Sequence, residues 1–201
     1  MEKLLLYCTK ATPYLVKDED CLNNPYYTHS SEQGSCGETF NGKIVAECDC
    51  EKVEEIAYTR TISNIRNGYQ YGNVNNFYTN SLSLKDEFQI KTCLSENELI
   101  SYFKPKNHRY EKCGYALHLS NLNIFDKPKE LSEYFKDDFL QYVSDKDTRI
   151  HKAPQNMCYV YDRFGNHYVL ISIQPQHLCK ILNGEKTIEI RKSILNSLKE
   201  E

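Results

Sequence analysis

Four polar residues near the end of the 201-residue chain have the types and spacing of a ligand-binding strand. In EKTIEIRK (185–192), Thr187, Glu189 and Arg191 alternate with two isoleucines, so one strand face is polar and the other apolar. Lys186 and Arg191 can donate to phosphate or base acceptors, and Glu189 can accept from an amino group or hold Arg191 in place. The same residues also fit a structural Glu–Arg pair on a solvated strand face. Both interpretations stay open at this point.

The elements just before this strand are predicted from their own patterns. A helix is expected over 175–182, because a proline suits its first turn, an apolar stripe follows, and an Asn-Gly pair stops it. Before it, 156–162 and 167–173 read as two strands. The four residues between them, with Gly165 or Asn166 able to take a positive φ, predict a hairpin turn.

The rest of the chain supplies fewer regular elements. A capping box of Ser95 and Glu98 begins a helix in CLSENELISYF (93–103). The other expected segments are a short buried strand at 3–9, an irregular insertion at 10–41, a long strand at 42–58, a long loop at 59–83, and a strand at 114–131 that leaves a turn at Pro128.

Composition narrows the class of protein. The net charge of −3, from 25 basic and 28 acidic residues, argues against a protein that grips duplex nucleic acid mainly through phosphates. The opening MEKLLLYCTK is too short for the apolar region of a secretory signal, and no apolar run approaches the length of a membrane span. We therefore expect one cytoplasmic domain without a membrane partner, as a monomer or homodimer.

The nine cysteines are odd in number and contain no CxxC pair. We expect reduced, mostly buried thiols, and no metal or other cofactor. A zinc site that uses Cys36, Cys48 and Cys50 is the weaker alternative, because paired zinc ligands favour a two-residue gap.

The helix–Gly–Lys–Thr–x–Glu–x–Arg unit in SIQPQHLCKILNGEKTIEIRK resembles the opening segment of ASCH domains, which belong to the PUA-like β-barrel class. The blocks LLLYCTKATPYL, NGKIVAECDCEKVEEI, CLSENELISYF, GYALHLSNLNIFDKPKELSEYF and APQNMCYV resemble, in order, a bacterial and phage ASCH subfamily. The resemblance covers most of the chain outside 18–40, 59–85 and 137–151. It implies one domain over 1–201 with an α+β fold: a PUA-like small β-barrel of five to six mixed strands, with short flanking helices and long loop insertions.

The order of these blocks resembles a circular permutation. The family's usual arrangement begins with the helix–strand motif and continues with the YCTK strand, whereas here the motif comes last, at 169–192. A short hairpin through 164–166 would join the old termini if the two flanking strands are antiparallel neighbours.

The resemblance implies a partner, RNA or a small nucleotide, held by its base or phosphate at the mouth of the barrel. The YCTK strand would then lie beside the motif strand. The candidate ligand-binding residues are Lys186, Thr187, Glu189, Arg191, Tyr7, Thr9, Lys10, His118, Gln155 and Asn156. For the last six, an ordinary strand end, a core histidine or strand-end capping explains the same residues.

Two departures from the subfamily concern the ligand. Leu117 and Met157 stand where related blocks carry tryptophans. If those tryptophans stack on a ligand, the stacking platform has changed; if they pack in the core, the two replacements are a change of volume with little consequence.

Two other classes of function remain as alternatives: a hydrolase, either an amidohydrolase or a ribonuclease, and a nucleotide sponge. Some small ASCH proteins resemble amidohydrolases of N4-acetylcytidine, which use the motif lysine, a threonine three residues later and a distant glutamate. In this chain Lys186 matches the lysine, but Glu189 occupies the position of the threonine. A ribonuclease could use Lys186 and Glu189 as acid and base. In a sponge that sequesters a signalling nucleotide, the segments 18–40 and 59–83 would be lids, or they are simply disordered.

Overall fold

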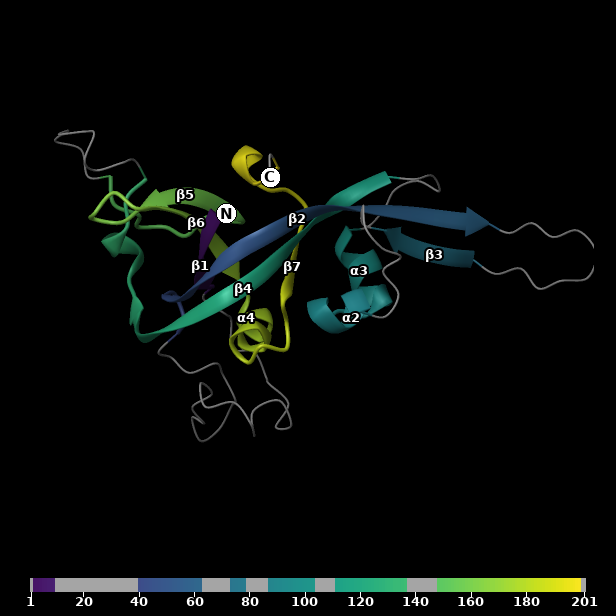
Figure 1. Cartoon of the computed structure of the whole chain (residues 1–201), viewed down its shortest axis with the longest axis horizontal. Helices are drawn as coiled ribbons and strands as arrows, with labels where there is room; N and C mark the ends of the chain where they lie inside the picture. The colour runs from purple at the N-terminus through teal and green to yellow at the C-terminus, as the bar shows by residue number, and fades with distance from the viewer. Residues whose placement is uncertain are drawn as a thin grey trace, which may run out of the picture. The chain divides into compact units, whose positions relative to one another are not determined.

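The computed structural model of the chain describes residues 2–9, 40–62, 73–78, 87–103, 111–136 and 148–199 (Figure 1). Its strands are β1 (Glu2–Cys8), β2 (Ile44–Ile62), β3 (Asn73–Tyr78), β4 (Glu111–Lys129), β5 (Met157–Tyr161), β6 (His167–Ile173) and β7 (Ile188–Arg191). Its helices are α2 (Glu87–Thr92), α3 (Glu96–Phe103) and α4 (Pro175–Leu182), with 3-10 turns η1 (Leu131–Glu133) and η2 (Asn196–Lys199).

The strands form a mixed sheet, and the chain divides into two compact units that share the two long strands β2 and β4. Unit 1 comprises Met1–Glu51 and Leu119–Glu185, where the strand order is β5-β6-β1-β2-β4. Unit 2 comprises Lys52–His118 and Lys186–Glu201, where β3 and β4 flank β2 and β7 pairs with β4. The α+β class is therefore confirmed. Within the described residues, neither unit's pairings close into a barrel.

Unit 1 is built on the parallel pair β1 and β6, in which Leu4 to Cys8 align with Val169 to Ile173. The last five residues of each strand are buried, and all of them except Ser172 are apolar, as expected for parallel strands covered on both faces. The predicted hairpin is confirmed, because β5 pairs antiparallel with β6 and Gly165 has a φ of 82°. The predicted helix at 175–182 is also confirmed; it ends at Leu182, and Gly184, two residues later, has a φ of 76°.

Unit 2 packs two short helices against the apolar face of the motif strand. Ile188 and Ile190 share a buried cluster with Phe88 of α2 and Leu99 of α3. The predicted capping box at the start of α3 is confirmed: the Glu98 N–H donates to Ser95 Oγ at 3.3 Å, and the Ser95 N–H donates to Glu98 Oε2 at 2.7 Å.

Two expectations about irregular segments are wrong in part. The predicted loop at 59–83 contains a ladder, because β2 continues to Ile62 and its residues Ala57–Ile62 pair with β3. Backbone pairing forms this ladder although its Asn-rich sequence has no hydrophobic period. The strand expected to leave a turn at Pro128 continues to Lys129, and the chain turns instead in η1. Most of the two proposed lids, 18–39, 63–72 and 79–83, lies outside the described residues.

The expectation of mostly buried thiols is confirmed for the described cysteines. Cys8, Cys48, Cys50 and Cys179 are buried. Cys36, the third residue of the alternative zinc site, lies outside the described part of the chain. Among the described residues, no three His, Cys, Asp or Glu side chains gather closely enough to hold a metal ion.

Stability is expected to fall as the pH rises above about 9, in part through Cys48. Burial raises the pKa of this thiol from 9.0 to about 12, and the neighbouring Cys50 and Asp49 add to the rise. The folded protein therefore holds the proton more tightly than the unfolded chain, so the stabilisation is complete below pH 9 and is lost between pH 9 and 12. In urea unfolding from pH 8 to 10, the free energy of unfolding should fall by up to about 1.4 kcal/mol per pH unit because of this group. The decrease with pH should be smaller in Cys48→Ala. If the free energy of unfolding depends on pH in the same way in the wild type and in Cys48→Ala, the thiol of Cys48 is not its cause.

Candidate functional site

The motif strand is buried on both faces rather than solvated on one. β7 runs antiparallel to β4, with Tyr115 opposite Arg191 and Leu117 opposite Glu189. Glu189 is 6% exposed and Arg191 8% exposed, and Lys186 just before the strand is 3% exposed. A solvated Glu–Arg pair, one of the two sequence-based interpretations, is therefore not what forms.

The three charged side chains make a connected ion network. Lys186 Nζ lies 3.1 Å from Glu189 Oε2, and Arg191 Nη2 lies 3.0 Å from Glu189 Oε1. One carboxylate thus holds two cations in a place with little water, where Coulomb interactions are strong and removal of one partner is costly. The network fixes where both cationic groups point, which is a requirement for a preorganised anion site.

The end of α2 positions the first of these cations. Lys186 Nζ donates to the Thr92 carbonyl at 3.1 Å, and the Thr187 N–H donates to the Lys91 carbonyl at 2.9 Å. The motif therefore satisfies carbonyls at the C-terminus of α2, where a positive charge is also favoured by the helix dipole. Lys186 has a structural role here whatever else it binds. The exposed Thr187 side chain lies outside β7, and the contacts of Lys186 are with Thr92 and Glu189, so no Lys–Thr nucleophile is assembled by these two residues.

The network reaches the surface beside an exposed aromatic ring. Tyr102 of α3 is 39% exposed, and Lys192 Nζ lies 4.7 Å from the centre of its ring. Burial raises the pKa of Tyr102, while Arg191 lowers it and Glu189 raises it, so the phenol feels both charges of the network. Tyr102 and Lys192 are not among the site residues expected from the sequence. In the sequence, Tyr102 is distinguished only as an aromatic residue on the polar side of a helix, and Lys192 only as a further cation directly after Arg191.

The remaining candidates do not gather at β7. Tyr7 and Thr9 line a cavity of about 550 Å³ in unit 1, together with His151 and Lys152. The expectation that the YCTK strand lies beside the motif strand is wrong, because β1 pairs with β2 and β6 whereas β7 pairs with β4. Lys10 lies outside the described residues.

Gln155 and Asn156 belong to the segment that enters β5 in unit 1. Gln155 is exposed, and the Asn156 carbonyl accepts the Ser172 N–H at 3.0 Å. That hydrogen bond is the strand-end role that the alternative interpretation gave to Asn156.

His118 belongs to a different ion pair of unit 2. Its Nε2 lies 2.7 Å from Glu54 Oε2, and Lys52 Nζ lies 2.6 Å from the other oxygen of the same buried carboxylate. Leu117, one of the two tryptophan replacements, is fully buried and serves as a core residue, whereas Met157 is half-buried in β5. Leu117 therefore offers no exposed surface on which a base could stack.

Comparison of the chain with protein-family models, with curated proteins and with solved structures found no match in any of the three. Among the described residues, no helix has the length and apolar character that a membrane span requires.

Proposed function

We propose that the chain is a permuted ASCH domain of the PUA-like class that binds RNA or a nucleotide through β7 and its surroundings in unit 2. The observation that carries the proposal is the buried network of Lys186, Glu189 and Arg191, which adjoins the exposed Tyr102 and Lys192. Two fixed cations, one mobile cation and one aromatic face are the parts that nucleotide recognition uses.

Each part has a distinct role in this proposal. Lys192 is exposed and free of the buried network, so it can turn from the ring of Tyr102 to a phosphate. The ring face that it leaves would stack on a base, an interaction worth roughly 1–3 kcal/mol per base. Arg191, held by Glu189, supplies a fixed positive charge next to that ring.

The hairpin of unit 1 supports the permuted arrangement. β5 and β6 are antiparallel neighbours, and only the turn at 162–166 joins them. The Asp162 carboxylate accepts the N–H groups of Phe164 and Asn166 at 2.8 Å and 2.9 Å, so the turn is well formed. A tight junction between adjacent strands is what fusion of former termini requires. A barrel closed in the PUA-like manner remains part of the proposal.

Binding can be tested by fluorescence anisotropy with a labelled single-stranded RNA of mixed sequence. Lys192→Glu and Tyr102→Ser should each weaken binding by about tenfold, because they remove a phosphate contact and a stacking surface without touching the buried pairs. Lys180→Glu on α4 makes the same charge change in unit 1 and serves as the matched control, with an expected change of less than twofold. Equal losses in Lys192→Glu and Lys180→Glu would indicate non-specific charge attraction and would contradict the proposed site.

A further inference from the structure

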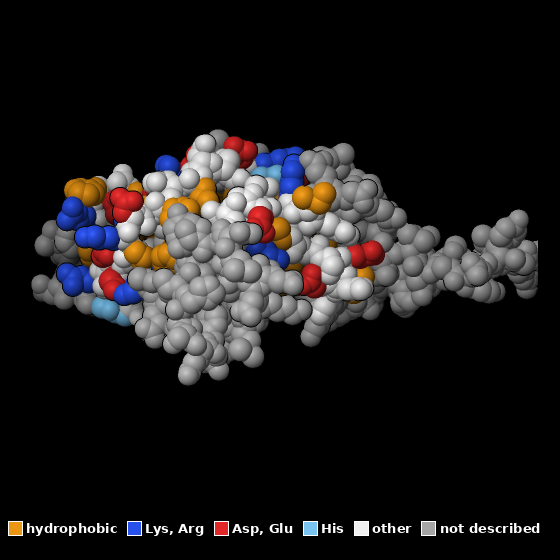
Figure 2. Space-filling model, turned by 90° about the horizontal axis from the view of Figure 1, so that it is seen from below, with side chains coloured by type: hydrophobic (Ala, Val, Ile, Leu, Met, Phe, Trp, Pro, Cys, Tyr) orange, Lys and Arg blue, Asp and Glu red, His pale blue; other side chains and the backbone are white. Residues whose placement is uncertain are grey.

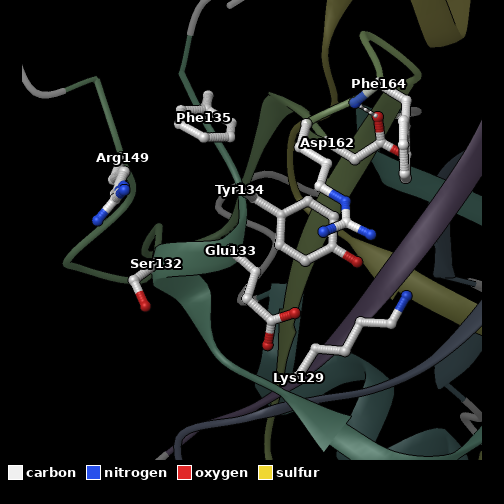
Figure 3. A pocket seen from close by; sticks show the side chains of 9 residues that line it. Lys129, Ser132, Glu133, Tyr134, Phe135, Arg149, Asp162 and Phe164 are labelled. Atoms are coloured by element: carbon white, nitrogen blue, oxygen red, sulfur yellow. Dashed lines mark hydrogen bonds between the residues drawn. The ribbon is translucent and has the colours of Figure 1, made fainter.

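A second cavity, of about 500 Å³, lies in unit 1 and has no part in the site on β7. Its walls come from the end of β4, the segment 131–135, Arg149 and the β5–β6 turn (Figure 3). Backbone hydrogen bonds hold two of these walls together: the Phe135 N–H donates to the Tyr161 carbonyl at 2.8 Å, and the Tyr161 N–H donates back at 2.9 Å. The volume falls in the range of small-ligand sites.

Two cations at this cavity have aromatic rings as partners rather than carboxylates. Lys129 Nζ lies 3.9 Å from the centre of the Phe125 ring, and Arg163 Cζ lies 4.6 Å from that of Phe164. In the part of the chain that the structure describes, neither side chain forms an ion pair. Cation–π contacts at exposed sites are weak, so both groups can be drawn to an anion at little cost.

A neutral donor lines the same cavity as these cations. Tyr134 is buried, and burial together with the nearby Tyr168 and Glu133 raises the pKa of its hydroxyl, which therefore stays protonated at neutral pH. Figure 3 shows Tyr134 and Lys129 among the side chains that line the cavity. A hydroxyl and a flexible ammonium that line one cavity are suitable donors for phosphate oxygens.

The two acidic side chains of the cavity are engaged with backbone N–H groups. Glu133 Oε1 accepts the Glu130 N–H at 2.7 Å, and Asp162 Oδ1 accepts those of Phe164 and Asn166. With Lys129, Arg149 and Arg163, the cavity holds three positive and two negative side chains, an excess of one positive charge. An excess of one positive charge fits a ligand with one phosphate better than a ligand with several phosphates, which carries more negative charge.

The exposed ring of Phe164 lies next to the charged side chains of the cavity. Phe164 is 66% exposed on the hairpin turn and is one of the few large hydrophobic side chains so exposed among the described residues. On the face drawn in Figure 2, Lys and Arg side chains lie among hydrophobic and acidic ones. An exposed ring beside cations is typical of surfaces on which bases stack.

We propose that this cavity is a separate site for a nucleoside monophosphate. Lys129, Arg163 and the Tyr134 hydroxyl take the phosphate, and the exposed face of Phe164 takes the base. Glu133 limits the phosphate charge that the cavity accepts, and its second oxygen can receive an amino group of the base. The site does not depend on the proposed role of β7.

The test is isothermal titration of the full chain with AMP and, separately, with adenosine. AMP should bind at least about tenfold more tightly than adenosine. Lys129→Gln should remove that preference, whereas Phe164→Ala should weaken both ligands about tenfold, because the first removes a phosphate contact and the second the stacking surface. Lys127→Gln, an exposed lysine on the same strand, is the matched control and should bind as the wild type does.

Two outcomes would overturn the inference: no heat with AMP, or AMP binding that is unchanged in Lys129→Gln and Phe164→Ala. A Lys192→Glu/Tyr102→Ser variant separates this site from the one on β7. If AMP binding is lost in that variant and kept in Lys129→Gln, the ligand occupies the β7 site and the cavity in unit 1 is not a nucleotide site. If the reverse holds, the cavity binds AMP even where the proposal for β7 fails.

Discussion

Glu189→Ala is expected to lower the free energy of unfolding by about 3–5 kcal/mol, the cost of breaking a buried ion pair by removing one partner. Glu189 is the only member of the network with a negative charge, and it holds Lys186 at 3.1 Å and Arg191 at 3.0 Å. Its removal leaves two buried cations to repel each other, and desolvation makes both more costly. Urea unfolding followed by circular dichroism measures the change directly.

Glu185→Ala is the matched control, because Glu185 precedes the same strand but is exposed. We expect a change of at most about 0.5 kcal/mol for it, as for other surface substitutions. A loss of less than about 1 kcal/mol in Glu189→Ala would mean that water reaches the network freely, which contradicts its burial.

Gly114→Ala is expected to cost about 3 kcal/mol or more, because overpacking at a backbone contact cannot be relieved by a side-chain movement. A Cβ at this position in β4 would collide with the Arg191 carbonyl oxygen of β7 and would lie 2.6 Å from Phe103 Cε1. Either β7 or α3 must move, and both carry residues of the proposed site. Nucleotide or RNA binding should therefore fall together with stability, measured by thermal unfolding and by anisotropy on the same samples.

Gly184→Asn is the contrasting substitution. Gly184 has a φ of 76°, a conformation that asparagine tolerates, and a Cβ there meets open space. A change within about 0.5 kcal/mol is expected. If Gly114→Ala were as mild as Gly184→Asn, the close approach of β4 to β7 would be refuted.

The fold elements that could be predicted are those with a local cause. The hairpin at 157–173, the helix at 175–182 and the capping box at Ser95 follow from turn residues, periodicity and capping chemistry that lie within a few residues of each other. The β3 ladder could not be predicted, because its strand is Asn-rich and gains its stability from pairing with β2. The neighbours of β1 and β7 in the sheet depend on pairings between distant segments, and the expectation for them was wrong.

Alternation indicates a polar strand face at Thr187, Glu189 and Arg191, but it does not indicate the environment of that face. Thr187, Glu189 and Arg191 were expected on one polar face, whereas Thr187 is exposed before the strand and the other two are buried with Lys186. Burial of a charged face depends on what packs over it, and here α2 supplies the carbonyl of Thr92. The partner of His118 on β2 likewise depends on strand register, which a single sequence does not specify.

Native mass spectrometry of the protein purified from cells tests the central claim most directly. The wild type should carry an adduct of nucleotide or oligonucleotide mass that is lost in the Lys192→Glu/Tyr102→Ser variant and kept in Lys180→Glu. Both variants leave the buried pairs of Glu189 intact, so loss of the adduct reports on binding rather than on folding. An adduct that persists in the double variant would contradict the placement of the site beside β7.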